Sequence, residues 1–174
     1  MSFDLPETLD ILGRTPSVLN ALLRGTSRSW HAIDEGAETW SAFDVVGHLV
    51  HADETDWIPR ARIILEHGDS RAFEPFDRFA QFERYGDWSL DALLDRFAEL
   101  REANLELVRS WQLTEADLAR PGRHPELGSV DLGQLLATWV VHDLNHIGQV
   151  TRVMAKRYSE QVGAWRAYLS ILIR

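Results

Sequence analysis

The feature that most constrains the fold is an apolar stripe between residues 132 and 153. Apolar side chains recur there in steps of three or four, the spacing of one face of an α-helix. The stripe consists of Leu132, Leu135, Trp139, His142, His146, Val150 and Val153. Because His142 and His146 are four residues apart on this stripe, both imidazoles are expected to project together toward a core.

Histidines on a buried stripe need polar partners. A polar group that is buried without a partner costs about 2–7 kcal/mol. A metal ion would satisfy both imidazoles, since neutral imidazole is the commonest protein metal ligand. A lone histidine on an apolar stripe is usually a hydrogen-bonded core residue, so a third ligand is needed to favour metal.

His48 is the candidate for that third ligand. Ser41 can cap a helix that begins there, with Asp44 three residues later as its capping-box partner, and His48 then lies on an inward face. Three nitrogen ligands leave a position for water or substrate, whereas structural zinc sites usually close with four protein ligands. The sequence therefore predicts a metal site at His48, His142 and His146.

The other histidines have weaker patterns. His51 is one turn beyond His48 but rotated about 60° off its face, which favours a solvated position or a hydrogen bond to one of the ligands. His31, His67 and His124 occur in loop-like or helix-end sequence and are expected at the surface.

No carboxylate is assigned as a general base. Asp143 follows His142 as glutamate does in the His-Glu-x-x-His motif of zinc proteases. However, it points about 100° away from the histidine stripe and is shorter than glutamate, which disfavours a protease. We expect Asp143 to orient a neighbouring group or to pair at the surface. Asp53 and Glu54 are candidates to support His48, with a solvated face as the alternative.

Composition excludes several classes of protein. A chain of 174 residues is expected to form one domain, residues 1–174. The net charge of −9 argues against a nucleic-acid partner. The absence of cysteine excludes disulfides, thiolate metal sites and a cysteine nucleophile. No apolar run approaches the roughly 20 residues of a membrane helix, and the first residues lack signal-peptide features, so we expect a cytoplasmic protein.

Periodicity and capping signals predict an all-α protein. The expected helices span residues 4–25, 42–66, 89–111, 131–157 and, as a short C-terminal helix, 162–173. Pro16 is expected to begin a renewed helix, and Pro59 to bend or restart the second one. Residues 113–130 contain two prolines and two glycines and are predicted to form a long loop without strands. Aromatic residues spaced by three from Phe73 to Tyr85 cover one end of the core or line a pocket. Four long helices favour a four-helix bundle.

Two segments resemble a known family. Residues 39–49 (TWSAFDVVGHL) and 139–149 (WVVHDLNHIGQ), supported by residues 56–62 and 73–79, resemble the DinB-like (YfiT-like) family. The resemblance extends from about residue 14 onward and implies a four-helix bundle with His48, His142 and His146 as metal ligands. It also implies zinc or nickel as the divalent ion, a small-molecule substrate and a homodimer. Members are described as metal-dependent hydrolases, and related branches as transferases or isomerases that use low-molecular-weight thiols.

Several functions remain open at this level. A three-histidine site can make hydroxide available for hydrolysis, or hold an incoming thiol as thiolate for transfer to an electrophile. In the transfer reaction a small thiol would be the cosubstrate. A rival hypothesis is a non-catalytic stress-response or binding module in which the ion stabilises the fold. A bundle without metal would instead need protein or water partners for three inward histidines.

Overall fold

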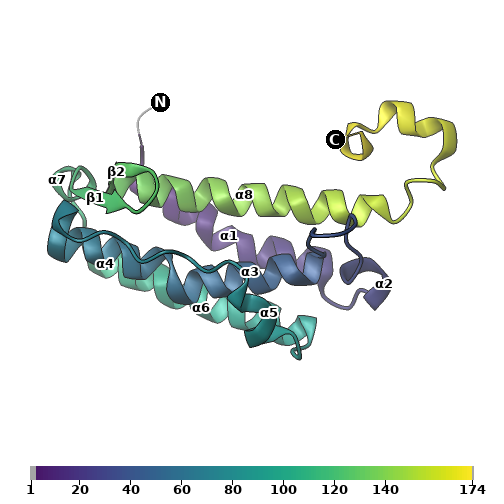
Figure 1. Cartoon of the computed structure of the whole chain (residues 1–174), viewed down its shortest axis with the longest axis horizontal. Coiled ribbons are helices and arrows are strands. Elements are labelled where there is room, and N and C mark those ends of the chain that lie inside the picture. Colours follow the sequence, from purple (N-terminus) through teal and green to yellow (C-terminus); the bar gives the residue numbers. More distant parts are fainter. Residues whose placement is uncertain (1–2, 174) are drawn as a thin grey trace.

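Four long helical segments form an all-α bundle (Figure 1). The computed structural model describes residues 3–173. The segments are α1 (Leu5–Leu23), α3 with α4 (Ala42–Thr55 and Trp57–His67), α6 (Leu90–Ser110) and α8 (Leu132–Lys156). Helices α1 and α3 each contact α6 and α8, so α1 lies diagonally across the bundle from α3. The predicted four-helix bundle is confirmed.

Shorter elements occupy the connections. They are α2 (Arg28–His31), η1 (Gly68–Ser70), α5 (Ala80–Tyr85), α7 (Glu115–Leu118), β1 (Pro121–His124), β2 (Gly128–Asp131), η2 (Gly163–Tyr168) and η3 (Ser170–Leu172). Within residues 3–173 no helix combines the length and apolar character needed to cross a bilayer.

The long helices begin at or within one residue of the expected positions, each with a capping side chain. The side chains of Asp4, Ser41, Ser89 and Asp131 each accept a hydrogen bond from a backbone N–H three residues later. Ser41 and Asp131 also form complete capping boxes, in which the third helical residue bonds back to the cap backbone. These contacts satisfy N–H groups that the first helical turn leaves without partners, and so fix where α3 and α8 start.

Pro16 does not restart a helix, so that prediction is wrong. Helix α1 continues through Pro16 from Leu5 to Leu23. Proline has no N–H, and the carbonyl of Leu12, four residues earlier, therefore loses its helical donor. The Arg101 Nη1 group of α6 donates to that carbonyl at 2.9 Å. Tertiary structure thus replaces the missing helical hydrogen bond.

Pro59 restarts the second long helix, as predicted. The proline ring clashes with the carbonyl four residues earlier, at Thr55, which is where α3 ends. Asp56 has φ −114° and ψ −67°, and α4 begins at Trp57. The resulting break lies about two helical turns beyond His48.

The prediction of a long loop without strands at residues 113–130 is wrong in part. This segment contains α7, and strands β1 and β2 form a β-hairpin. Strands β1 and β2 pair antiparallel, with Gly122 opposite Val130. Each strand has four residues, too few for a visible alternation of apolar and polar positions. Gly122 is buried against Ile64 and Phe73, so a methyl group there would lie 2.6 Å from Ile64 Cγ1.

The C-terminal segment forms two 3₁₀ helices instead of one short α-helix. Helix η2 and helix η3 follow the end of α8, and η3 contacts α8 (Figure 1, yellow). Leu172 of η3 is buried, whereas Trp165 and Tyr168 of η2 are exposed. Burial of Leu172 therefore helps to hold this segment against α8.

The apolar core consists of two clusters separated by a polar layer. On α1, Leu12 belongs to one cluster and Leu19 to the other; on α8, Trp139 and Val150 are divided in the same way. Arg101 of α6 lies between the two sets and is buried. The candidate site lies at this level of the bundle.

Candidate metal centre

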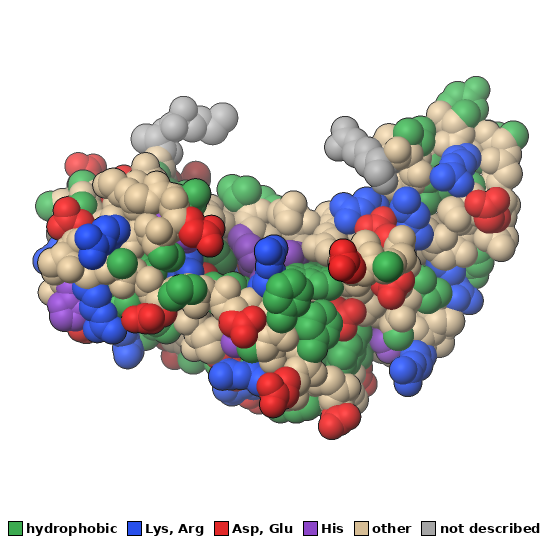
Figure 2. Space-filling view, in the orientation of Figure 1, with side chains coloured by type: hydrophobic (Ala, Val, Ile, Leu, Met, Phe, Trp, Pro, Cys, Tyr) green, Lys and Arg blue, Asp and Glu red, His purple; other side chains and the backbone are tan. Residues whose placement is uncertain are grey.

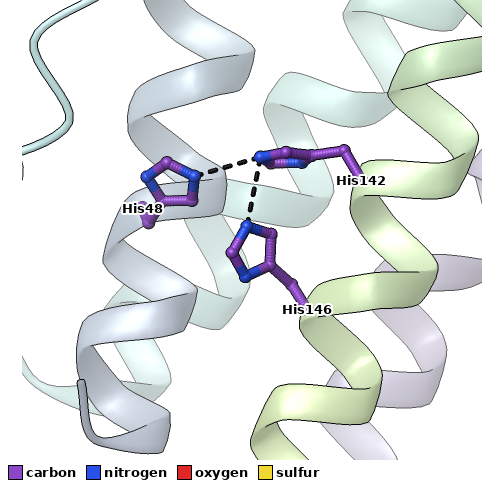
Figure 3. A group of neighbouring side chains, drawn as sticks. All are labelled: His48, His142 and His146. Carbon is purple, nitrogen blue, oxygen red and sulfur yellow. Dashed lines mark hydrogen bonds between the residues drawn. The ribbon is translucent and has the colours of Figure 1, made fainter. Parts of the chain in front are cut away.

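Three histidine side chains from two helices converge inside the bundle (Figure 3). His48 comes from α3, and His142 and His146 come from successive turns of α8. Both helices begin at capping boxes, which set the rotation of their inner faces. His48 and His146 are buried and His142 is half-buried. The three residues that the sequence singled out therefore lie together.

The ring nitrogens of the three side chains face one another. His142 Nε2 lies 3.0 Å from His48 Nε2 and 3.1 Å from His146 Nε2 (Figure 3). All three ligand atoms lie within 4.8 Å of one another. We call these residues the histidine cluster.

The tautomer of His146 is fixed by a neighbour on its own helix. His146 Nδ1 lies 2.8 Å from Gln149 Oε1. A carbonyl oxygen only accepts, so Nδ1 carries the proton and donates. The lone pair of His146 Nε2 is then directed at the centre of the cluster, which is the orientation that a metal ligand needs.

Burial keeps the cluster neutral. Desolvation, followed by the neighbouring His146, lowers the pKa of His48 to about 3 and that of His142 to about 2. Desolvation also lowers the pKa of His146. The ring of Trp40 lies 4.9 Å from that of His48, and the ring of Trp57 lies 5.1 Å from that of His142. These aromatic side chains contribute to the burial that leaves the imidazole nitrogens unprotonated near neutral pH.

The arrangement fits a metal ion better than it fits hydrogen bonds alone. One proton on His142 Nε2 points in one direction and forms a good hydrogen bond with only one of its two neighbours. Nitrogens around one tetrahedral zinc ion are about 3.3 Å apart, close to the two short separations found here. A single cation would satisfy all three lone pairs.

Two cavities flank the histidine cluster. One, of about 420 Å³, is lined by His48 and His146, and the other, of about 410 Å³, by His48 and His142. We call them the α8-end cavity and the hairpin cavity, because Arg152 lines the first and His124 the second. Figure 2 shows histidine surface in a hollow near the middle of one face. The cluster is therefore open to small molecules.

A buried ion network lies beside the cluster. Arg101 donates to both oxygens of Asp53 at 2.9 and 3.0 Å and to both oxygens of Asp143 at 2.5 and 3.2 Å. Together with the Leu12 carbonyl, these contacts connect α1, α3, α6 and α8. The guanidinium also lies over the rings of Phe97 and Trp139. One side chain thus fixes the helix that carries two of the histidines.

This network corrects the expectations for the carboxylates. Asp143 is fully buried and bonded to Arg101, so pairing at the surface is wrong and the alternative, that Asp143 orients a neighbouring group, agrees with the structure. Asp53 is also buried, not solvated, and supports Arg101 instead of His48. Glu54 accepts from the Tyr85 hydroxyl at 2.7 Å and pairs with Arg96, away from the cluster.

The remaining histidines do not join the cluster. His51 is buried and its Nε2 lies 3.1 Å from the Asp77 carbonyl oxygen, so a solvated position is wrong. His67 is exposed, as expected, whereas His31 and His124 are half-buried.

Sequence reasoning missed two residues that organise the site. Gln149 follows His146 by three positions, a spacing that brings side chains together on a helix. Arg101 continues the steps of three or four set by Leu94, Phe97 and Leu105. An arginine on an apolar stripe signals buried carboxylate partners, because an unpaired buried charge is costly.

Comparisons with known proteins agree with this architecture. The family model of the DinB superfamily matches residues 11–150. A protein of Oceanobacillus iheyensis, provisionally named a metal-dependent hydrolase, is 24% identical over 120 residues, which are 68% of this chain and 67% of that protein. The structure is similar to that of YfiT from Bacillus subtilis, described as a probable metal-dependent hydrolase with an unusual four-helix bundle topology. The TM-score is 0.75 at 22% identity, covering 87% of this chain and 86% of YfiT. With the family model spanning most of its length, the chain belongs to the DinB superfamily.

Proposed function

We propose that the chain is a metal-dependent hydrolase of small molecules in which His48, His142 and His146 hold a divalent ion. The observation that carries the proposal is the convergence of three neutral imidazoles at one point between two cavities. The names of the two relatives support the same reading. Three nitrogen ligands and no thiolate favour zinc, with nickel as the alternative.

The protein residues would have distinct tasks. When bound, the ion supplies Lewis-acid chemistry that lowers the pKa of water or of a thiol reaching it. Gln149 keeps His146 in the tautomer that directs its Nε2 at the ion. Trp40 and Trp57 limit the water around the cluster. The two cavities provide space for the parts of a substrate on either side of the reacting bond.

Metal content tests the first half of the proposal. Protein purified without a histidine tag is analysed for metals, together with His142→Ala and, as a matched control, His67→Ala, which changes an exposed histidine. We expect about one equivalent of zinc or nickel in the wild type and in His67→Ala, since three histidines typify a catalytic zinc site. His142→Ala should lose it. Substoichiometric metal in the wild type as well as in His142→Ala would contradict the proposal.

Activity tests the second half. The same proteins are assayed on a panel of esters and amides, with and without an added low-molecular-weight thiol. Hydrolysis without thiol, lost in His142→Ala, supports the proposed function. Turnover of an electrophile that requires the thiol would assign a thiol S-transferase instead. Stoichiometric metal that raises the unfolding temperature without any turnover would assign a structural ion.

A further inference from the structure

Arg78 lies where the two cavities meet. Among the described residues, 3–173, the α8-end cavity and the hairpin cavity share two lining residues, His48 and Arg78. Arg78 belongs to the connection between η1 and α5, outside the four helices of the bundle. A ligand in either cavity would therefore meet both a cluster histidine and this guanidinium.

Arg78 is the cavity arginine whose charge is not neutralised. In the hairpin cavity, Arg60 pairs with Asp56 at 2.6 Å, and in the α8-end cavity Arg152 pairs with Glu35 at 2.8 Å. Among residues 3–173, Arg78 has no hydrogen bond or ion pair. Its guanidinium lies 5.4 Å from the ring of Phe79, which leaves its N–H edge free to donate.

The segment that carries Arg78 is anchored to the site. The Asp77 carbonyl lies 3.1 Å from His51 Nε2, and Asp77 Oδ1 accepts from the Phe79 N–H at 2.9 Å. The ring of Phe76 packs 5.6 Å from that of His48. These contacts hold the residues on both sides of Arg78, so its backbone has a defined position beside the cluster.

We propose that Arg78 binds a carboxylate of the substrate, which makes the substrate a small carboxylic acid with its reacting bond at the histidine cluster. This inference rests on the proposed function and names its substrate class. A guanidinium matches a carboxylate with two parallel N–H donors. The protein carries a net charge of −9, so a free cation at this point selects an anionic group against the general repulsion. Trp57 and Phe76 line the hairpin cavity and would contact an apolar part of the same molecule.

A pair of probes isolates this contact. Succinic acid monohydroxamate and its neutral terminal carboxamide share the metal-binding hydroxamate and differ in the far carboxylate. Their dissociation constants are measured by calorimetry on zinc-loaded wild type, Arg78→Gln and Arg62→Gln. Arg62 is exposed on α4 and lines neither cavity, so its variant makes the same change in net charge elsewhere.

In the wild type we expect the acid to bind about tenfold more tightly than the amide, the effect of one exposed charge-assisted contact. Arg78→Gln should bind both probes equally, whereas Arg62→Gln should keep the preference. The preference should shrink in 0.5 M salt, where exposed charges are screened. Equal binding in the wild type, a preference that survives Arg78→Gln, or no binding of either probe would overturn the inference. Zinc content and binding of the neutral probe report separately on the proposed function.

Discussion

Replacing Arg101 with methionine should remove the cation from a buried network and leave two carboxylates without their partner. The side chains of Asp53 and Asp143 are each 1% exposed, so water cannot replace the lost guanidinium. Breaking a buried ion pair by removing one partner costs about 3–5 kcal/mol. Methionine has a similar length and is apolar, so the loss reports mainly on charge and hydrogen bonding.

The cost should depend on pH. Burial raises the pKa of Asp53 to about 6 even with Arg101 present, and loss of the cation raises it further. A folded state with a raised carboxyl pKa holds a proton that the unfolded chain releases above about pH 4. Stability therefore falls as pH rises through this window. Arg101→Met should be least harmful near pH 5, where Asp53 is protonated, and most harmful near pH 8.

Urea unfolding of chelator-treated protein, followed by circular dichroism at pH 5 and pH 8, measures this difference. Arg14→Met serves as control, because Arg14 pairs with Asp10 at the surface, where the side chains are 68% and 65% exposed. The control should lose less than about 1 kcal/mol at either pH. Adding Asp53→Asn and Asp143→Asn to Arg101→Met should recover at least half of the loss. A loss below about 1 kcal/mol for Arg101→Met at pH 8, or one that is independent of pH, would refute the reasoning.

Three substitutions test packing and capping by the same unfolding measurement. Gly122→Ala should lower the free energy of unfolding by about 1–3 kcal/mol, because its methyl group would lie 2.6 Å from Ile64 Cγ1. An unchanged free energy of unfolding would mean that the hairpin can shift away from Ile64 without cost. Gly148 lies on a helix surface, where an added Cβ would have no described atom within 4 Å. Gly148→Ala should therefore raise the free energy of unfolding by about 0.5–1 kcal/mol. Ser41→Ala should lose about 1 kcal/mol, since Ser41 caps α3; an unchanged midpoint would argue against the capping box as a source of stability.

The histidine cluster could be predicted because helical periodicity records which residues share a face. His142 and His146 lie on a stripe that the structure buries, and the Ser41 capping box sets the start of α3 and so the direction of His48. Such signals are local, within one or two turns of helix. That the three histidines face one another depends on how α3 packs against α8. The sequence pattern placed each histidine on an inner helix face but did not specify this packing.

Features that depend on contacts distant in sequence were missed. The partners of Arg101 lie 48 and 42 positions away in the sequence. The residues around Asp53 and Asp143 do not indicate that either carboxylate pairs with an arginine so distant in the chain. Pro16 was expected to interrupt α1. The hydrogen bond from Arg101 of α6 that replaces the missing helical donor comes from a distant part of the chain and cannot be read from the sequence around Pro16. The hairpin at Gly122 was hidden for a similar reason, since its short strands are held by contacts with Ile64 and Phe73.

The separation of His48 and His142 by 94 positions has a consequence for how the molecule assembles. Residues this far apart meet only after a long loop has closed, and the entropy of closure is lost before the contact can stabilise anything. The pair on α8 needs only one turn of helix, but the third nitrogen arrives when α3 docks. Completion of the cluster therefore requires this long loop to close, and a chain in which α3 has not docked lacks the complete three-nitrogen set.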